Sequence, residues 1–164
     1  MSVLLSIVFT LAAAHGAGPT AVDARAELDT HDGVQDLRFG ALCSTLPGWP
    51  ADATLDSDTL RWTVAPVPLH AHDVTAPARS YGCVRGRLAA VAIDLPRTRD
   101  ARRATAHLMA VFGPPESARP GVATWAGRTV EVRLESGPPR RLVWAARRYL
   151  PALGEAPADV PSTR

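Results

Sequence analysis

The chain has 164 residues, of which 46% are apolar and 21% are charged, and its formal net charge is +2. This length indicates one domain with its own core, and 15 Pro with 12 Gly argue against a helical bundle. All 18 basic residues are Arg, a bias that a GC-rich gene also produces, and so small a net charge does not indicate a nucleic-acid partner.

The N-terminal stretch resembles a secretory signal peptide. Residues 3–14 read VLLSIVFTLAAA without a charge, which suits the apolar part of such a peptide and is too short to cross a bilayer. We expect a signal peptide at 1–16, cleaved after Gly16 or else Ala17, and a periplasmic or secreted protein with no membrane span in the mature chain. A buried N-terminal segment of a cytosolic protein and an uncleaved anchor are the alternatives.

Two strands are predicted in the first half of the chain, and the clearer one is at 60–64. Leu60, Trp62 and Val64 alternate with Arg61 and Thr63, which is the pattern of a half-buried strand. The segments around it are expected to be a linker or short helix at 17–32, a short strand at 33–40, a loop at 47–58 and a Pro-rich excursion without periodicity at 65–79.

An amphipathic helix is predicted at about 98–112. Apolar residues recur there at helical spacing, Thr98 is the expected N-cap, and Gly113 with two following prolines ends the helix. Hairpins and strands surround it, at 81–84 with 88–95, at 122–125 with 129–134, and at 142–147, before a disordered tail at 151–164. This order predicts a two-layer α+β domain at 33–150, with an antiparallel sheet of about five to seven strands and the helix on one face.

Cys43 and Cys83 are the only cysteines, and an even count in an exported chain indicates a disulfide. Closing a loop of about 41 residues would stabilise the fold by roughly 4 kcal/mol in the chain-entropy model. Two unrelated buried thiols are the alternative.

The charges are unevenly distributed along the chain. Residues 17–73 hold nine acidic residues and three Arg, whereas residues 74–164 hold seven acidic residues and fifteen Arg. This split predicts either a dipolar surface or two halves that face and pair with each other within one fold, and we favour the second.

His70, His72 and Asp73 form the best metal-ligand pattern. Alternate residues of an extended segment can direct both imidazoles to one side, and His31 is the expected source of a further ligand. The alternative is a solvated pair of loop histidines. No nucleophile elbow is present and Glu131 reads as a solvent-facing strand residue, so we predict no catalytic residues and no cofactor.

Surface contact residues are expected around one tryptophan and one run of arginines. Trp49 lies between Gly48 and Pro50 in a predicted loop, so of the four tryptophans it is the one expected to be exposed, with core packing as the alternative. Arg99, Arg102 and Arg103 lie on the solvent side of the predicted helix. Such residues would bind a protein or a glycan of the envelope or extracellular space.

Three short motifs resemble a pattern of small exported bacterial α+β domains that are mostly uncharacterised. They are Phe39-Gly40 at the end of GVQDLRFG, Phe112-Gly113-Pro114-Pro115 after the helix, and Trp125-Ala126-Gly127 in a hairpin, together covering about 33–147. The resemblance implies export and an α+β sheet, and it implies no activity.

The sequence therefore favours a small exported, non-catalytic binding domain whose sheet is the platform and whose ligand is unknown. The alternative is a secreted hydrolase or metal-dependent enzyme that uses the His70 and His72 region. A structural or assembly component is a third possibility.

Overall fold

The computed structural model describes residues 26–53, 58–72 and 74–153. The expected signal peptide at 1–16, Asp73 of the predicted metal set and positions 154–164 of the predicted tail lie outside the described residues. Within the described residues, no helix is long and apolar enough to span a membrane.

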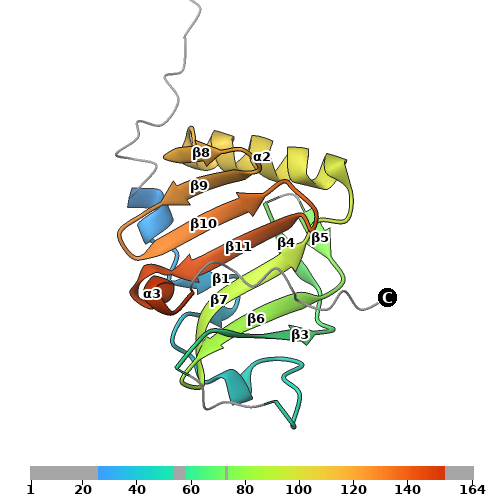
Figure 1. Ribbon diagram of the computed structural model, residues 1–164, viewed down its shortest axis with the longest axis vertical. Coiled ribbons are helices and arrows are strands. Elements are labelled where there is room, and N and C mark those ends of the chain that lie inside the picture. Colours follow the sequence, from blue (N-terminus) through green and yellow to red (C-terminus); the bar gives the residue numbers. More distant parts are fainter. Residues whose placement is uncertain (1–25, 54–57, 73, 154–164) are drawn as a thin grey trace, which may run out of the picture.

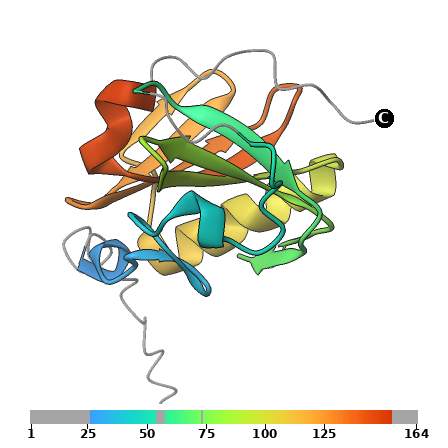
Figure 2. The ribbon, with the colours of Figure 1, turned by 90° about the horizontal axis from the view of Figure 1, so that it is seen from below.

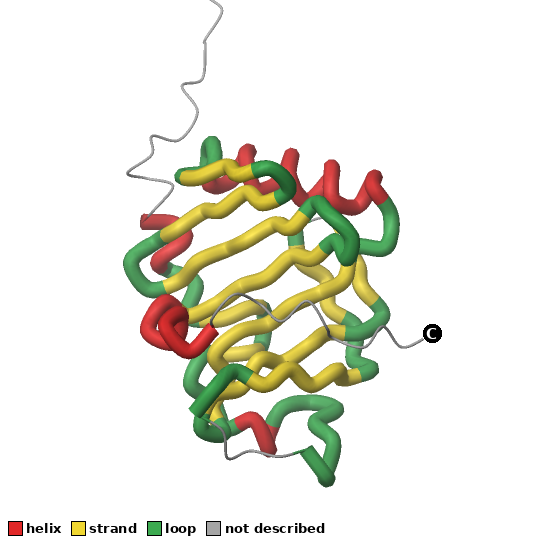
Figure 3. The backbone as a smooth tube through the Cα atoms, in the orientation of Figure 1, coloured by secondary structure: helices red, strands yellow, loops and turns green. Residues whose placement is uncertain are grey.

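The main element is a seven-stranded antiparallel sheet with the strand order β3-β6-β7-β11-β10-β9-β8 (Figure 1; Figure 3). The chain builds it as two groups of strands, and β7 of the first group pairs with β11 of the second. The strands are β3 (Arg61–Ala65), β6 (Arg79–Val84), β7 (Arg87–Asp94), β8 (Ser117–Arg119), β9 (Val122–Ala126), β10 (Val130–Glu135) and β11 (Arg141–Ala146). The predicted α+β class and antiparallel sheet are confirmed.

Helix α2 (Thr98–Phe112) connects the two groups of strands. Its buried residues are Ala101, Ala104, Leu108 and Phe112, so the predicted apolar stripe faces the core. Thr98 is not the N-cap as expected: Arg97 occupies that position with an extended backbone and makes no side-chain cap bond. The helix ends at Gly113, which has a φ of 71° and whose carbonyl accepts a bond from Trp125 Nε1 at 2.9 Å.

The two faces of the sheet differ in what covers them. Figure 2 shows α2 and the small elements on one side, which we call the inner face. In β10 the inner face carries Val130, Val132 and Leu134, all buried, whereas the outer face carries charged residues. The small elements are β1 (Gly33–Val34), β2 (Leu37–Arg38), η1 (Cys43–Thr45), β4 (Leu69–Ala71) and β5 (Val74–Ala76). Short helices η2 (Arg147–Tyr149) and α3 (Leu150–Leu153) follow the last strand.

The Pro-rich segment at 65–79 contains regular structure that the sequence did not predict. It forms the β4–β5 hairpin, in which Leu69, Val74 and Ala76 are buried in the core. Strands of three residues are too short to show a hydrophobic period, which is why the pattern was missed. The edge strand β8 was missed for the same reason, and all three of its residues are exposed.

Cys43 and Cys83 lie at disulfide distance, with their Cα atoms 6.5 Å apart. Cys43 belongs to η1 and Cys83 to β6, and both are buried. The pair therefore fastens the loop after β2 to the inner face of the sheet.

Several ion pairs join the acidic first half of the chain to the basic second half. Asp29 lies 3.3 Å from Arg128, Asp36 lies 3.7 Å from Arg79, and Asp58 pairs with Arg85. The described contacts therefore favour two halves that pair within one fold over a dipolar surface.

Candidate functional site

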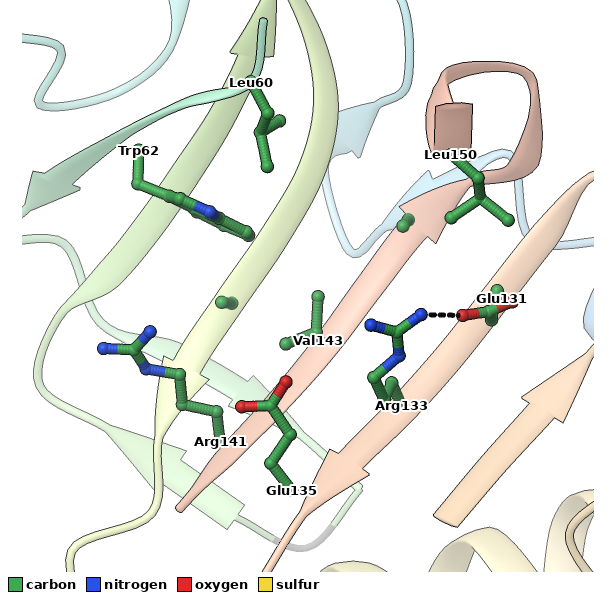
Figure 4. Close-up of a pocket in the computed structure, with 10 residues that line it drawn as sticks. Leu60, Trp62, Glu131, Arg133, Glu135, Arg141, Val143 and Leu150 are labelled. Carbon is green, nitrogen blue, oxygen red and sulfur yellow. Dashed lines mark hydrogen bonds and ion pairs between the residues drawn. The ribbon is translucent and has the colours of Figure 1, made fainter. Parts of the chain in front are cut away.

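The outer face of the sheet brings together residues from five strands. One registered row runs from Trp62 on β3 through Gly82, Ala90 and Ala145 to Glu131 on β10. The short helix α3, which contributes Leu150, lies at the margin of this face (Figure 1). The middle of the face is therefore floored by small residues, and larger side chains stand on both sides of it (Figure 4).

Trp62 lies over Gly82, its neighbour in this row. A Cβ atom at Gly82 would meet Leu60 Cδ1 at 2.9 Å, Trp62 Cζ3 at 3.2 Å and the Ala90 Cβ at 3.2 Å. A Cβ atom here would make the leucine shift and would press on the indole, so the glycine lets both side chains lie close against the sheet. Trp62 is half-buried as a result, with its ring directed across the face (Figure 4).

Charged residues stand on β10, opposite Trp62, and at one end of the face, where β7 ends and β11 begins (Figure 4). Arg133 Nη2 lies 2.8 Å from Glu131 Oε1, and Arg141 Nε lies 3.0 Å from Asp94 Oδ1. Glu135 faces Arg141 in the strand register. Because β-strand side chains alternate, Glu131, Arg133 and Glu135 all project from one side of β10. The described ion pairs compensate most of the charge of these groups.

A pocket lies between the tryptophan side and the charged side. It encloses only about 30 Å³, which is room for roughly one water molecule. A larger molecule would therefore have to lie across the face instead of entering it. The pocket is lined by Leu60, Trp62, Ala92, Glu131, Arg133, Glu135, Arg141, Val143, Ala145 and Leu150 (Figure 4).

The predicted metal ligands have different partners. His70 Nδ1 lies 2.8 Å from Thr75 Oγ1 across the β4–β5 hairpin, on an exposed surface. His72 follows with a φ of 48° and stacks on Trp144 at 5.5 Å between ring centroids, accepting a bond from Trp144 Nε1 at 3.2 Å. His31 contacts the edge of Phe112 at 6.0 Å. In the described part of the chain no group of three or more His, Cys, Asp or Glu residues is placed to hold a metal.

The predicted contact residues lie away from the outer face. Trp49 packs against the core, with its ring centroid 6.3 Å from that of Tyr81, so its side chain follows the core-packing alternative. Arg99, Arg102 and Arg103 are exposed on α2, which covers the inner face of the sheet (Figure 2).

The sequence contained the residues of the outer face but not their assembly. The alternation of apolar and polar residues predicted the strand that carries Trp62 and the strand that carries Glu131 and Arg133. Nothing in the pattern indicated that β3 and β10 belong to one sheet with only three strands between them.

A scan against protein-family models, a search of the curated proteins and a search of the solved structures each found no match. The resemblance to small exported bacterial domains therefore stays a prediction.

Proposed function

We propose that this chain is a small exported, non-catalytic binding domain of the cell envelope or extracellular space, and that its ligand binds the outer face of the sheet. In this two-layer arrangement α2 backs the sheet and the outer face is the contact surface. One observation carries the proposal: Trp62 and the Arg133–Glu131 ion pair stand on opposite sides of a floor of glycine and alanine, and the Arg141–Asp94 pair lies at the end of that floor where β7 ends and β11 begins (Figure 4).

The geometry supports binding over hydrolysis. Glu131 and Glu135 are four residues apart on one strand, which separates their Cα atoms by about 13 Å at roughly 3.3 Å per residue. Glycosidase carboxylates are about 5 to 9.5 Å apart. Glu131 is also engaged by Arg133, and a shallow pocket does little to exclude water. These features suit recognition of a molecule that stays unchanged.

Two features support export. The apolar leader has the length of a signal-peptide core, and a cysteine pair at disulfide distance is typical of proteins in oxidising compartments. The intact mass of the protein recovered outside the cytosol tests this part, and we expect a mature chain that begins at Ala17 with no free thiol.

The binding face is tested by comparing variants on two sides of the molecule. Columns carrying the wild-type protein, Trp62→Ala or Met109→Ala are loaded with a solubilised envelope fraction, and the retained material is compared. We expect Trp62→Ala to retain several-fold less and Met109→Ala, at an exposed position of α2, to match the wild type. Equal retention by a folded Trp62→Ala variant would show that the outer face is not the binding surface.

A further inference from the structure

We infer that the ligand of the outer face is a neutral oligosaccharide, with one sugar ring stacked on Trp62 and its hydroxyl groups hydrogen-bonded to Arg133, Arg141 and Glu135. This inference rests on the proposed function and names the class of molecule that the same face would take. Three properties of the face carry it: its aromatic side, its charge and its extent.

The aromatic side of the face offers a flat apolar surface whose position above the sheet is fixed. The Trp62 ring is held by its contact over Gly82 and by Leu60 beside it. An indole held in this way presents an apolar ring face with a polar edge. The C–H face of a sugar ring has the same combination, because its hydroxyl groups lie around the rim.

The charge of the face favours a neutral polar ligand. Two guanidinium groups face three carboxylates: the ion pairs Arg133–Glu131 and Arg141–Asp94 compensate two of the carboxylates, and Glu135 adds one negative charge. A strongly anionic chain would need an excess of positive charge, which this face lacks. The described ion pairs engage one nitrogen of each guanidinium, which has five N–H donors, and a carboxylate accepts up to about four bonds. Hydroxyl groups both donate and accept, so they complement this mixed set.

The extent of the face favours several linked sugars over one. The enclosed volume of about 30 Å³ is far too small to surround a sugar ring. From β3 to β10 there are four steps between neighbouring strands, or about 19 Å at roughly 4.8 Å per step. Trp62 and Arg133 come from the strands at the two ends of this span. Their side chains both line the shallow pocket between them, and the surrounding face is wider than one sugar ring.

The experiment uses the mature exported protein on an array of immobilised neutral and acidic oligosaccharides, followed by titration calorimetry with the soluble hexasaccharide that binds best. We expect binding to a neutral glycan that is nearly independent of salt, because no net charge is neutralised. Trp62→Ala should weaken it about tenfold or more, since loss of stacking and apolar contact exceeds roughly 1.4 kcal/mol. Trp62→Phe should restore part of the affinity, and Met109→Ala, at an exposed position of α2, should leave it unchanged.

Two outcomes overturn the inference and leave the proposed function standing. The first is binding only to acidic glycans with a steep salt dependence. The second is no binding to any neutral glycan while Trp62→Ala still loses retention of envelope material, which would identify a protein or peptide ligand. If neither the glycans nor the envelope fraction distinguishes Trp62→Ala from the wild type, the proposed function falls as well.

Discussion

At the scale of single residues, the outer face depends on the absence of a side chain at Gly82. The register of β6 with β7 shifts between Gly82 and Cys83, but Gly82 has no positive φ, so the glycine is not needed for an unusual backbone angle. It is needed because Leu60 and Trp62 occupy the space where a Cβ atom would be. The position of the indole and the stability of the edge strand are therefore set by the same residue.

We expect Gly82→Ala to lower the free energy of unfolding by about 1 kcal/mol, because overpacking forces neighbouring side chains to move. Trp62 should move away from the sheet, and the affinity of the outer face should fall with it. Urea unfolding measures the loss of stability. The fluorescence of Trp62, obtained by subtracting the spectrum of the matching Trp62→Phe variant, reports the movement of the indole.

Gly137→Ala is the matched control, because a Cβ atom there meets nothing within 4 Å. Equal losses of stability in both variants would show that the cost comes from the glycine backbone and not from the contact with Trp62.

At the scale of elements, a helical turn at residues 26–29 is fastened to the turn between β9 and β10. Asp29 accepts bonds from the Thr129 N–H at 2.9 Å and the Thr129 hydroxyl at 3.2 Å, and it lies 3.3 Å from Arg128 Nε. Leu28 beside it is buried in the core. Residues expected to be a linker or short helix thus pack against a hairpin from the other end of the chain.

This contact predicts a dependence of stability on pH. Burial by itself would raise the pKa of the Asp29 carboxyl, but the bonds from Thr129 and Arg128 outweigh it, so the pKa is lower in the folded chain than in the unfolded one. The stabilising contribution is therefore present above the unfolded pKa and is lost as pH falls through the folded pKa.

Asp29→Asn should lower the free energy of unfolding by about 2 kcal/mol near neutral pH, and the difference from the wild type should shrink in acid. Denaturant unfolding of both proteins from pH about 2 to 7 checks the sign. A difference that grows as the solution becomes more acidic would contradict the assignment.

The elements also show where sequence reasoning succeeds. The α2 range was predicted because its apolar stripe spans four turns and Gly113 stops it, and β10 was predicted because six residues alternate without interruption. The β4–β5 hairpin failed because neither strand exceeds three residues. The outer face could not be predicted because its row of residues depends on the pairing of β7 with β11, which lie about fifty positions apart along the chain.

At the scale of the whole molecule, the ion pairs that join the two halves of the chain differ widely in how buried they are. Arg85 and Asp58 are both largely exposed, and such a pair contributes little. Arg79 is only 4% exposed, its guanidinium lies 5.6 Å from the Tyr81 ring centroid, and its Nε and Nη1 atoms make no hydrogen bond with the described residues. Asp36, at 3.7 Å, is its counter-charge from the first half.

Burying the Arg79 guanidinium with incomplete hydrogen bonding carries a desolvation penalty. This penalty is larger than the favourable interaction with the distant, mostly exposed carboxylate of Asp36. Arg79→Met should therefore leave the free energy of unfolding unchanged or raise it, whereas Asp36→Asn should lower it by about 1 kcal/mol because Arg79 keeps its charge. In the double variant Asp36→Asn should have no further effect. Denaturant unfolding of the wild type, the two single variants and the double variant gives the coupling energy between Arg79 and Asp36 as a double-mutant cycle.

An alkaline titration of the Tyr81 phenol tests the effect of the Arg79 charge independently. Burial raises the pKa of the Tyr81 phenol, while Arg79 lowers it and Asp36 raises it. Arg79→Met should therefore raise the pKa of Tyr81 further, and the absorbance of the two tyrosines reports it. A large loss of stability in Arg79→Met, with the phenol pKa unmoved, would mean that Arg79 supports the fold through packing of its aliphatic part and not through its charge.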